Sequence, residues 1–458
     1  MVHEKTIQDL LHEALGLGGD FAEIFIENRF NRSFGMIGGK LESALQGRDF
    51  GLGIRIYFGL NSIYTYTNQL KKDHLLEMIR QAVYLKKNNP SVRAVPFRHV
   101  IPEDVHQIRH RRIPSEREKI DLMRLSVSGI HDPEGLIQQV RVNYIDYEQR
   151  VTIANSDGLF VEDERLRTRL SVGVSALFQG EVQTGHMSQG AFGGFSFYEG
   201  INPADLGRES ARIAMTTVKA GHAPRGNMPV IIDKGFGGVL FHEASGHGLE
   251  ATSVAKGISV YSGKVGTQVA SPLVTAIDDG TIKGAWGSSV VDDEGTPTKR
   301  NVLIEKGVLK GYMIDRFGGL KMGEASTGSA RRESYKYEPT SRMTNTFIDQ
   351  GESDFDEIIE DTEYGLYAKY MGGGSVNPAT GEFNFAVMEG YMVRGGKIAE
   401  PVRGATLIGR GFDVLKNIDK VGNNLAYGQG MCGSVSGSVP VNVGQPTLRV
   451  KSITVGGR

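Results

Sequence analysis

Residues 170–177 read LSVGVSAL, with an apolar side chain at every second position from Leu170. Successive side chains of a β-strand point to opposite faces of the sheet, so this period of two predicts a strand with one buried face. Residues 140–144, VRVNY, alternate in the same way. The sequence NSDG at 155–158 lies between these stretches and is a strong hairpin signal. We therefore expect a run of antiparallel strands between residues 136 and 196.

The rest of the first half combines helices and further strands. Apolar residues at helical spacing predict amphipathic helices, and runs rich in Ile and Tyr predict strands. Residues 89–112 hold three prolines and many charges, which indicates an irregular connection. The predicted helices cover residues 6–15, 72–87, 115–128 and 203–219, and the predicted strands cover 21–27, 51–58 and 62–67.

The second half is rich in glycine. The chain holds 61 glycines in 458 residues, about 13% against a typical ~7%, and they concentrate in this half without a fixed period. Such glycines indicate tight turns and bulged strands. The predicted elements are a strand at 228–232, hairpins at 302–313 and 391–398, and a short helix at 355–359.

These patterns predict an α+β fold of two domains with large antiparallel sheets. Strands and helices do not alternate regularly, so a doubly wound parallel sheet is rejected. Residues 221–226, GHAPRG, are interpreted as a linker. We accordingly place an N-terminal α+β domain at 1–222. A glycine-rich, mostly β C-terminal domain follows at 223–458 and carries a metal-site helix.

Charge and composition narrow the classes of partner. Lys and Arg number 52 against 53 Asp and Glu, so the net charge is −1 and nothing favours direct nucleic-acid contact. A single cysteine excludes an intrachain disulfide and fits a reducing compartment. The N-terminal residues lack a signal peptide's apolar core, and no stretch approaches the ~20 apolar residues that span a bilayer. We expect a cytoplasmic protein with no membrane segment and no direct nucleic-acid partner.

The sequence HEASGH at 242–247 combines two imidazoles and a carboxylate. Imidazole binds zinc well, and Glu243 beside bound water could take its proton. In the usual zinc-protease motif the two histidines are four residues apart, whereas His242 and His247 are five apart. On a regular helix that spacing separates them by about 140°. We therefore predict a distorted helix, either with a π-type turn or ending near Gly246.

Catalytic zinc usually has three protein ligands and one open position. Cys432, the one cysteine, lies in GQGMCG at 428–433 and is the candidate third ligand. The alternative for Cys432 is a small buried apolar residue, and for the histidines a partly buried amphipathic helix. Glu250 is interpreted as an exposed helix charge rather than as another ligand.

Four segments together resemble the TldD/PmbA family, and specifically its TldD type. They occur in the family's order, and the resemblance covers nearly the whole chain. Any one segment alone would be a weak signal, but the combination is highly specific. The segments are HEASGHGLE at 242–250, VDDEGTP at 291–297, PTSRMTN at 339–345 and GQGMCG at 428–433.

The resemblance implies a cytosolic zinc metallopeptidase that hydrolyses unfolded or extended peptides. It assigns His242, His247 and Cys432 as ligands of Zn²⁺ and Glu243 as the general base on zinc-bound water. TldD-type subunits commonly pair with a TldE/PmbA-type paralogue that lacks the zinc motif. We therefore expect a heterodimer with such a paralogue, or a homodimer. No substrate-binding residue is assigned.

Other readings stay open at this point. The chain could be a non-catalytic scaffold or regulatory subunit with a structural zinc site, in which Glu250 would be the fourth ligand. It could instead be a binding module that regulates another protein or its DNA complex. A zinc hydrolase of non-peptide amides is a third reading.

Three further segments have uncertain roles. Residues 372–375, GGGS, could accept an extended peptide as an added strand or form a flexible surface loop. Asp292, Asp293 and Glu294 are interpreted as capping a loop rather than attracting a substrate's amino terminus. Arg342 and Asn345 lie in a family-like segment without an assigned chemical role.

Overall fold

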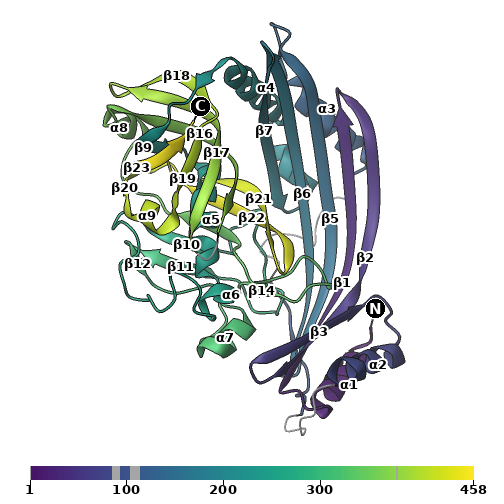
Figure 1. Ribbon diagram of the computed structural model, residues 1–458. Helices are drawn as coiled ribbons and strands as arrows, with labels where there is room; N and C mark the ends of the chain where they lie inside the picture. The colour runs from purple at the N-terminus through teal and green to yellow at the C-terminus, as the bar shows by residue number, and fades with distance from the viewer. Residues whose placement is uncertain (1, 85–92, 104–113, 378–379, 458) are drawn as a thin grey trace.

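The computed structural model describes residues 2–84, 93–103, 114–377 and 380–457. A long sheet of N-terminal strands stands beside a β-rich C-terminal half, as Figure 1 shows. The neighbours in the long sheet are almost all antiparallel. The predicted α+β fold with large antiparallel sheets is confirmed, and the described chain contains no doubly wound parallel sheet.

The long sheet has seven described strands in the order β3-β2-β1-β5-β6-β4, with β7 also pairing with β6. One pairing is parallel, between β4 and β6. The strands are β1 (Phe21–Ile37), β2 (Lys40–Phe58), β3 (Asn61–Thr67), β4 (Arg98–Val100), β5 (Ile137–Asn155), β6 (Leu159–Phe178) and β7 (Glu181–Phe192).

The alternating stretch 170–177 lies in β6, and its burial follows its sequence. Leu170, Val172 and Val174 are fully buried, whereas Leu177 on the opposite face is 37% exposed. The predicted turn at 155–158 joins β5 to β6, and Gly158 there has a φ of 86°. The hairpin prediction is therefore confirmed in both its strands and its turn.

Two pairs of helices cover one face of the long sheet. Helices α1 and α2 pack on β1 and β2 near one end, and α3 and α4 pack on β5 and β6 near the other. Ser115 caps α3 in a capping box with Glu118. All four helices were predicted from periodicity, and they are α1 (Glu4–Gly16), α2 (Lys72–Val83), α3 (Glu116–Ser128) and α4 (Pro203–Lys219).

The C-terminal half contains an eight-stranded sheet, a six-stranded sheet and a two-stranded ribbon among the described residues. The eight-stranded sheet comprises β8 (Gly221–His222), β9 (Gly226–Ile232), β16 (Tyr364–Val376), β17 (Glu382–Arg394), β18 (Lys397–Arg403), β19 (Thr406–Arg410), β20 (Ile418–Val421) and β23 (Leu448–Gly456). The six-stranded sheet comprises β10 (Ala276–Asp279), β11 (Arg300–Glu305), β12 (Val308–Leu309), β15 (Asn345–Ile348), β21 (Ala426–Ser434) and β22 (Gly437–Gln445). The ribbon pairs β13 (Ala330–Arg331) with β14 (Thr340–Ser341).

Short helices connect the strands of the molecule. Most of those in the C-terminal half share one apolar core with its sheets, whereas residues 195–200 precede α4 in the N-terminal half and residues 355–360 pack in a smaller cluster. Strand β21 is the terminal strand of the six-stranded sheet, on the side that faces the long sheet (Figure 1). The helices are α5 (Val239–Ala244), α6 (Ala251–Val254), α7 (Arg316–Met322), α8 (Phe355–Glu360) and α9 (Gly411–Lys416), with 3-10 helices η1 (Phe195–Gly200), η2 (Gly235–Gly238) and η3 (Gly246–Leu249).

Local turn chemistry was predicted well in this half. The hairpin β11–β12 turns at Lys306 and Gly307, both with positive φ. The hairpin β17–β18 turns at Gly395 and Gly396, also with positive φ. Helix α8 matches the short helix predicted at 355–359. Three of these four turn positions are glycines, which adopt a positive φ without steric cost.

Two predicted connections contain regular structure. The segment 89–112 was predicted to be irregular, but β4 forms within it because its backbone pairs with β6. The presumed linker 221–226 contains β8, which pairs with β18. The end of the helix predicted at 72–87, and much of 89–112, lie outside the described residues.

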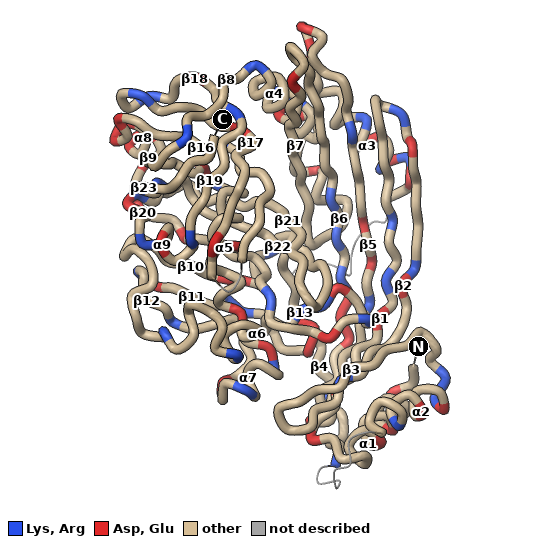
Figure 2. Tube along the Cα trace, viewed as in Figure 1, with Lys and Arg blue, Asp and Glu red and all other residues tan. Residues whose placement is uncertain are grey.

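Charges are spread over both halves of the molecule. Figure 2 shows Lys and Arg interspersed with Asp and Glu along most elements, in keeping with a net charge of −1. None of the described helices is both long and apolar enough to cross a membrane.

Candidate metal centre

The backbone changes direction between His242 and His247. Helix α5 ends at Ala244, Ser245 has φ −136° and ψ −42°, and the chain continues as η3. Of the two predicted distortions, the helix end is therefore the one observed. A Cβ at residue 246 would overlap the sulfur of Met343, so any larger residue there would require the Met343 side chain to move.

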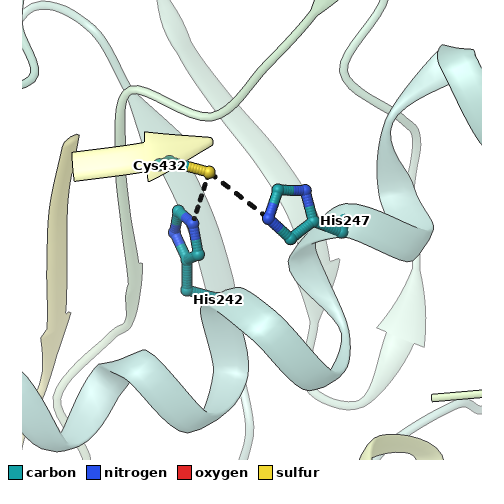
Figure 3. Close-up of side chains that lie close together, drawn as sticks. All are labelled: His242, His247 and Cys432. Atoms are coloured by element: carbon teal, nitrogen blue, oxygen red, sulfur yellow. Dashed lines mark hydrogen bonds between the residues drawn. The ribbon is translucent and has the colours of Figure 1, made fainter. Parts of the chain in front are cut away.

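This break brings both imidazoles to one cysteine. The Nε2 atom of His242 lies 3.2 Å from Sγ of Cys432, and Nε2 of His247 lies 3.3 Å from the same sulfur. Cys432 comes from β21, about 190 residues further along the chain and on a different element (Figure 3). His242 and Cys432 are almost fully buried, with exposed fractions of 1% and 3%.

The donor set fits a zinc ion. Zinc binds imidazole nitrogen at about 2.0–2.1 Å and thiolate sulfur at about 2.3 Å in tetrahedral geometry, which separates the two donors by about 3.5 Å. The two observed nitrogen–sulfur distances, 3.2 and 3.3 Å, are close to that value. Among the residues that the structure describes, no further His, Cys, Asp or Glu belongs to this group.

The electrostatics favour a thiolate at Cys432. Burial opposes ionisation of the thiol, but the imidazoles of His242 and His247 outweigh it and lower the pKa of Cys432 to about 3. Burial also lowers the pKa of His247, but the Glu250 carboxylate and Cys432 raise it well above its usual value. A thiolate is the form of cysteine that binds metal.

Glu243 lies beside the three donor atoms. Its Oε2 is 3.6 Å from Nε2 of His247, the nitrogen that faces Cys432, and its side chain is 29% exposed. The carboxylate is thus at the donor cluster and also reachable from solvent. This is the placement that a general base for hydrolysis requires.

The interpretation of Glu250 as an exposed helix charge was wrong. Glu250 is 4% exposed, and its Oε2 lies 3.1 Å from Nδ1 of His247. It is buried because the chain leaves the helix before Glu250 and re-enters the core. A carboxylate on the outer nitrogen of a histidine is the usual partner that fixes the orientation of a metal-binding imidazole.

The sequence assigned no chemical role to Arg342. In the structure its side chain lies against the backbone of the hairpin that carries Cys432. It is fully buried and donates to the carbonyl oxygen of Cys432 at 2.5 Å. It also donates to Oγ of Ser436 and to the carbonyl oxygen of Gly437. Arg342 therefore holds both strands of the β21–β22 hairpin. Only the folded chain brings these acceptors together, so no sequence signal could have shown this.

Asn345 supports the strand next to the same hairpin. Its side-chain amide donates to the carbonyl oxygen of Asp279 and to Oγ of Ser288, and it accepts from the backbone N–H of Gly287. All of these partners belong to loops and strands of the six-stranded sheet. Asn345 is thus a structural residue.

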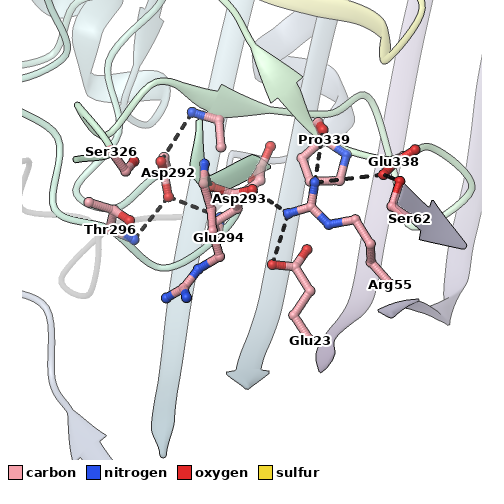
Figure 4. A network of polar contacts seen from close by, with 12 residues as sticks. Glu23, Arg55, Ser62, Asp292, Asp293, Glu294, Thr296, Ser326, Glu338 and Pro339 are labelled. Carbon is pink, nitrogen blue, oxygen red and sulfur yellow. Dashed lines mark hydrogen bonds and ion pairs between the residues drawn. The ribbon is translucent and has the colours of Figure 1, made fainter. Parts of the chain in front are cut away.

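The acidic segment 292–294 is buried between the two halves. Asp292 accepts from the backbone N–H groups of Glu294, Thr296 and Ala330, which is the loop-capping role expected of it. Figure 4 shows this network and its continuation to the long sheet. There Arg55 on β2 pairs with Glu23 and Glu294.

Asp293 makes a second connection of the same kind. It pairs with Arg165 on β6 and accepts from the backbone N–H of Arg332. All three acidic residues of 292–294 are thus engaged within the protein. A role in attracting a substrate's amino terminus has no support in this burial.

Residues 372–375 belong to strand β16 rather than to a loop. The pairing of β16 with β17 is irregular in this stretch, with a register shift between Met371 and Gly374. Gly372 and Gly373 line a cavity of ≈ 670 Å³ whose walls also include part of β7 and residues 426–429 of β21. Gln429 in this wall is three residues from Cys432, a separation of about 10 Å along a strand.

Three sequence profiles of one family match this chain in order. They describe PmbA/TldA metallopeptidase domain 1 at residues 22–85, the central domain at 110–218 and the C-terminal domain at 225–457. The C-terminal profile alone spans half of the chain.

Curated relatives match over almost their whole length. A protein of Haemophilus influenzae described as a metalloprotease TldD homologue is 36% identical over 449 residues, covering 96% of this chain and 93% of the relative. A protein of Saccharolobus solfataricus described as a zinc metalloprotease TldD homologue is 26% identical over 468 residues, covering 98% and 99%.

Solved structures show the same fold. A Thermotoga maritima protein described as a candidate modulator of a DNA gyrase has a TM-score of 0.82 at 23% identity, covering 99% of this chain and 100% of that one. TldE from Thermococcus kodakarensis has a TM-score of 0.75 at 18% identity, covering 99% and 100%. At these identities the likeness concerns the fold alone.

Proposed function

Because this chain belongs to the PmbA/TldA metallopeptidase family, we propose that it is a zinc-dependent peptidase that hydrolyses unfolded or extended peptides. The observation that carries this proposal is the meeting of His242, His247 and Cys432, with Glu243 beside them. The description of relatives as metalloproteases, one of them a zinc metalloprotease, supports it.

His242, His247 and Cys432 would hold the zinc ion. When bound, zinc would polarise the scissile carbonyl and make water more acidic. Glu250 keeps the His247 ring oriented through Nδ1, and Arg342 keeps the backbone of Cys432 in place. His247 and Cys432 are therefore held by buried partners, whereas Nδ1 of His242 has no hydrogen-bond partner among the described residues.

Glu243 is the proposed general base. Its carboxylate would take a proton from the attacking water and return it to the leaving amine. Its partial exposure lets substrate approach, whereas His242 and Cys432 are shielded from solvent.

The cavity beside β21 is the proposed substrate cleft. It lies along the strand that carries Cys432, and glycines 372 and 373 leave room for a peptide backbone in its wall. An extended peptide that pairs with main-chain groups there would be bound with little dependence on its side chains.

A scaffold with a structural zinc is the rival reading. Structural zinc sites use four protein ligands, and Glu250 was the candidate for the fourth. The Oε2 atom of Glu250 is engaged with the outer nitrogen of His247, which favours an orienting role. We therefore favour catalysis over the scaffold.

The partner that we propose is a TldE/PmbA-type paralogue. The likeness of the fold to TldE supports a shared architecture for such a pair. Gyrase modulation is part of the description of a structural neighbour, and no arrangement among the described residues favours it over hydrolysis.

Metal content and peptidase activity, measured on the same samples, test the proposal. Wild type, Glu243→Gln and the exposed control Glu305→Gln would be assayed on an unfolded polypeptide, alone and with a TldE/PmbA-type subunit. We expect one zinc per chain in all three and cleavage in wild type and Glu305→Gln only. Zinc in all three with equal activity, or with no activity under any condition, would instead indicate a structural site.

A further inference from the structure

A second cluster of charged residues lies on the other face of the β21–β22 hairpin from the zinc donors. A cavity of ≈ 50 Å³ is enclosed there between the long sheet and the C-terminal half. Met431 and its cross-strand partner Pro440 line it, and Met431 directly precedes Cys432. Since neighbouring side chains of a strand point to opposite faces, this cavity is separate from the metal centre.

The walls of this cavity carry excess positive charge. Five arginines line it, against three carboxylates. The arginines come from both halves of the molecule, and they are Arg29, Arg165, Arg167, Arg331 and Arg332; the carboxylates are Asp292, Asp293 and Glu333. We call this cavity the arginine cavity.

Two of the five arginines have carboxylate partners. Arg165 pairs with Asp163 and Asp293, and Arg332 pairs with Glu23. Asp293, one of the three carboxylates in the wall, is therefore already engaged in an ion pair. The carboxylate of Asp292 already accepts hydrogen bonds from three backbone N–H groups. The positive charges of the other three arginines must be compensated in another way.

Within the described part of the chain, Arg29, Arg167 and Arg331 form no salt bridge to a carboxylate. Arg167, 3% exposed, donates only to the neutral oxygens of Trp286, Ser288 and Tyr147. Arg331, 6% exposed, donates to the carbonyl oxygen of Met343. Buried charges in proteins are normally paired, because an unpaired one costs several kcal/mol of solvation.

Two guanidinium groups also keep unused donors at this place. The Nε atoms of Arg29 and Arg332 are buried and have no hydrogen-bond partner among the described residues. The Arg29 guanidinium lies 3.8 Å from the centre of the Tyr147 ring. Burial, together with the nearby Arg167, lowers the pKa of Arg331 to about 10. Of the carboxylates in the wall, Glu333 accepts from the backbone N–H of Ser438. The site thus keeps excess positive charge and unused donors.

We propose that the arginine cavity binds a small oxyanion, such as phosphate, sulfate or a carboxylate. A cavity of ≈ 50 Å³ has room for about four water molecules. This is about the size of an oxyanion with four or five non-hydrogen atoms. Planar guanidinium groups bind such oxygens in bidentate fashion. The anion would connect Arg29 and Arg167 of the long sheet with Arg331 of the C-terminal half, beneath the strand that carries Cys432.

Thermal unfolding of the full-length, zinc-loaded chain tests this proposal. Protein dialysed free of phosphate and sulfate would be heated with 10 mM sodium phosphate, sulfate or acetate, each compared with chloride at the same ionic strength. Wild type would be compared with Arg331→Met and with Arg141→Met, which removes an exposed arginine of the long sheet. For an anion present at about 100 times its Kd, we expect Tm to rise by about 3 °C.

The rise is expected in wild type and Arg141→Met but not in Arg331→Met. Without oxyanion, Arg331→Met removes an unpaired buried charge but also removes the donor to the Met343 carbonyl oxygen, so the readout is the oxyanion-dependent shift within each variant. If this variant does not fold, Arg29→Met serves in its place. Equal shifts in the cavity variant and wild type, or no oxyanion effect beyond chloride in wild type, would overturn binding of a free anion.

The carboxylate of a bound peptide is the other source of the same chemistry. A peptide pair that differs only in a free or amidated C-terminus would be added to Glu243→Gln protein in phosphate-free buffer. Stabilisation by the free acid alone, lost in the Arg331→Met background, would assign the cavity to a peptide carboxylate. Absence of any effect from both peptides and free oxyanions would overturn the proposal entirely.

Discussion

Oε2 of Glu250 lies 3.1 Å from Nδ1 of His247, while the other nitrogen of that ring faces Cys432. The carboxylate thus fixes which imidazole nitrogen is available to a metal. We expect Glu250→Ala to weaken zinc affinity by about 10–100-fold, and Glu250→Gln, which keeps an acceptor, to weaken it less. Competition with a chromophoric chelator measures both. Unchanged affinity in Glu250→Ala would show that His247 needs no such support.

Cys432 is expected to be indispensable for metal binding. Cys432→Ala removes the one sulfur donor, so zinc content should fall from about one per chain to a small fraction of that. The neighbouring side chain of Met431 points to the opposite face, so Met431→Ala should leave zinc content unchanged. Elemental analysis after dialysis against a weak chelator distinguishes them. Full zinc content in Cys432→Ala would exclude the sulfur as a ligand.

Arg342 should matter for stability and for the metal centre together. Arg342→Met leaves the carbonyl oxygens of Cys432 and Gly437 and the Ser436 hydroxyl without their donor. We expect a loss of about 3 kcal/mol in the free energy of unfolding and weaker zinc binding, measured by urea titration and chelator competition. Arg342→Lys should not restore either, since an ammonium cannot span the same acceptors. Full rescue by lysine would mean that charge alone suffices.

Glu294 gives the fold a defined pH dependence. Burial raises its pKa to about 8, although Arg55 acts in the opposite direction. A carboxyl with a higher pKa in the folded state binds more protons there, so the stability it contributes is present at low pH and is lost as pH rises through the folded pKa. We expect the urea concentration at the unfolding midpoint of wild type to decrease as the pH rises from about 5 to about 8.

The variant Glu294→Gln isolates this effect. It keeps the size and the acceptor oxygen of the side chain but does not titrate. Its urea midpoint should therefore depend less on pH over the same range. Parallel profiles for the two proteins would assign the pH dependence to other groups.

The period of two in residues 170–177 can be tested with two leucines. Leu170 is fully buried against α3 and α4, and Leu177 is 37% exposed. Leu170→Ala should reduce the free energy of unfolding by about 2–5 kcal/mol, and Leu177→Ala should change it by no more than about 0.5 kcal/mol. Urea titrations of both proteins measure the difference. Similar losses would contradict the assignment of the buried face.

Much of the local structure was readable from the sequence. The helices α3 and α4, the turn at Gly158 and the hairpin turn at Gly307 depend on neighbouring residues, through periodicity, capping and positive φ. The family resemblance also singled out His242, His247 and Cys432, which the structure brings together. Their assignment as zinc ligands stays a prediction until metal is measured.

The sequence by itself therefore determined the helices and main strands of the N-terminal half, the α+β class and the candidate donors, since each depends on short-range spacing or on a recognisable motif. Tertiary structure alone decided which side chains are buried with which partners. Arg342 acquires its role only where it meets the β21–β22 hairpin, 90 positions further along the chain. Arg167 and Arg331 share one cavity only because the long sheet packs against the C-terminal half. Contacts between residues more than a hundred positions apart depend on how whole sheets pack, and no local pattern records that packing.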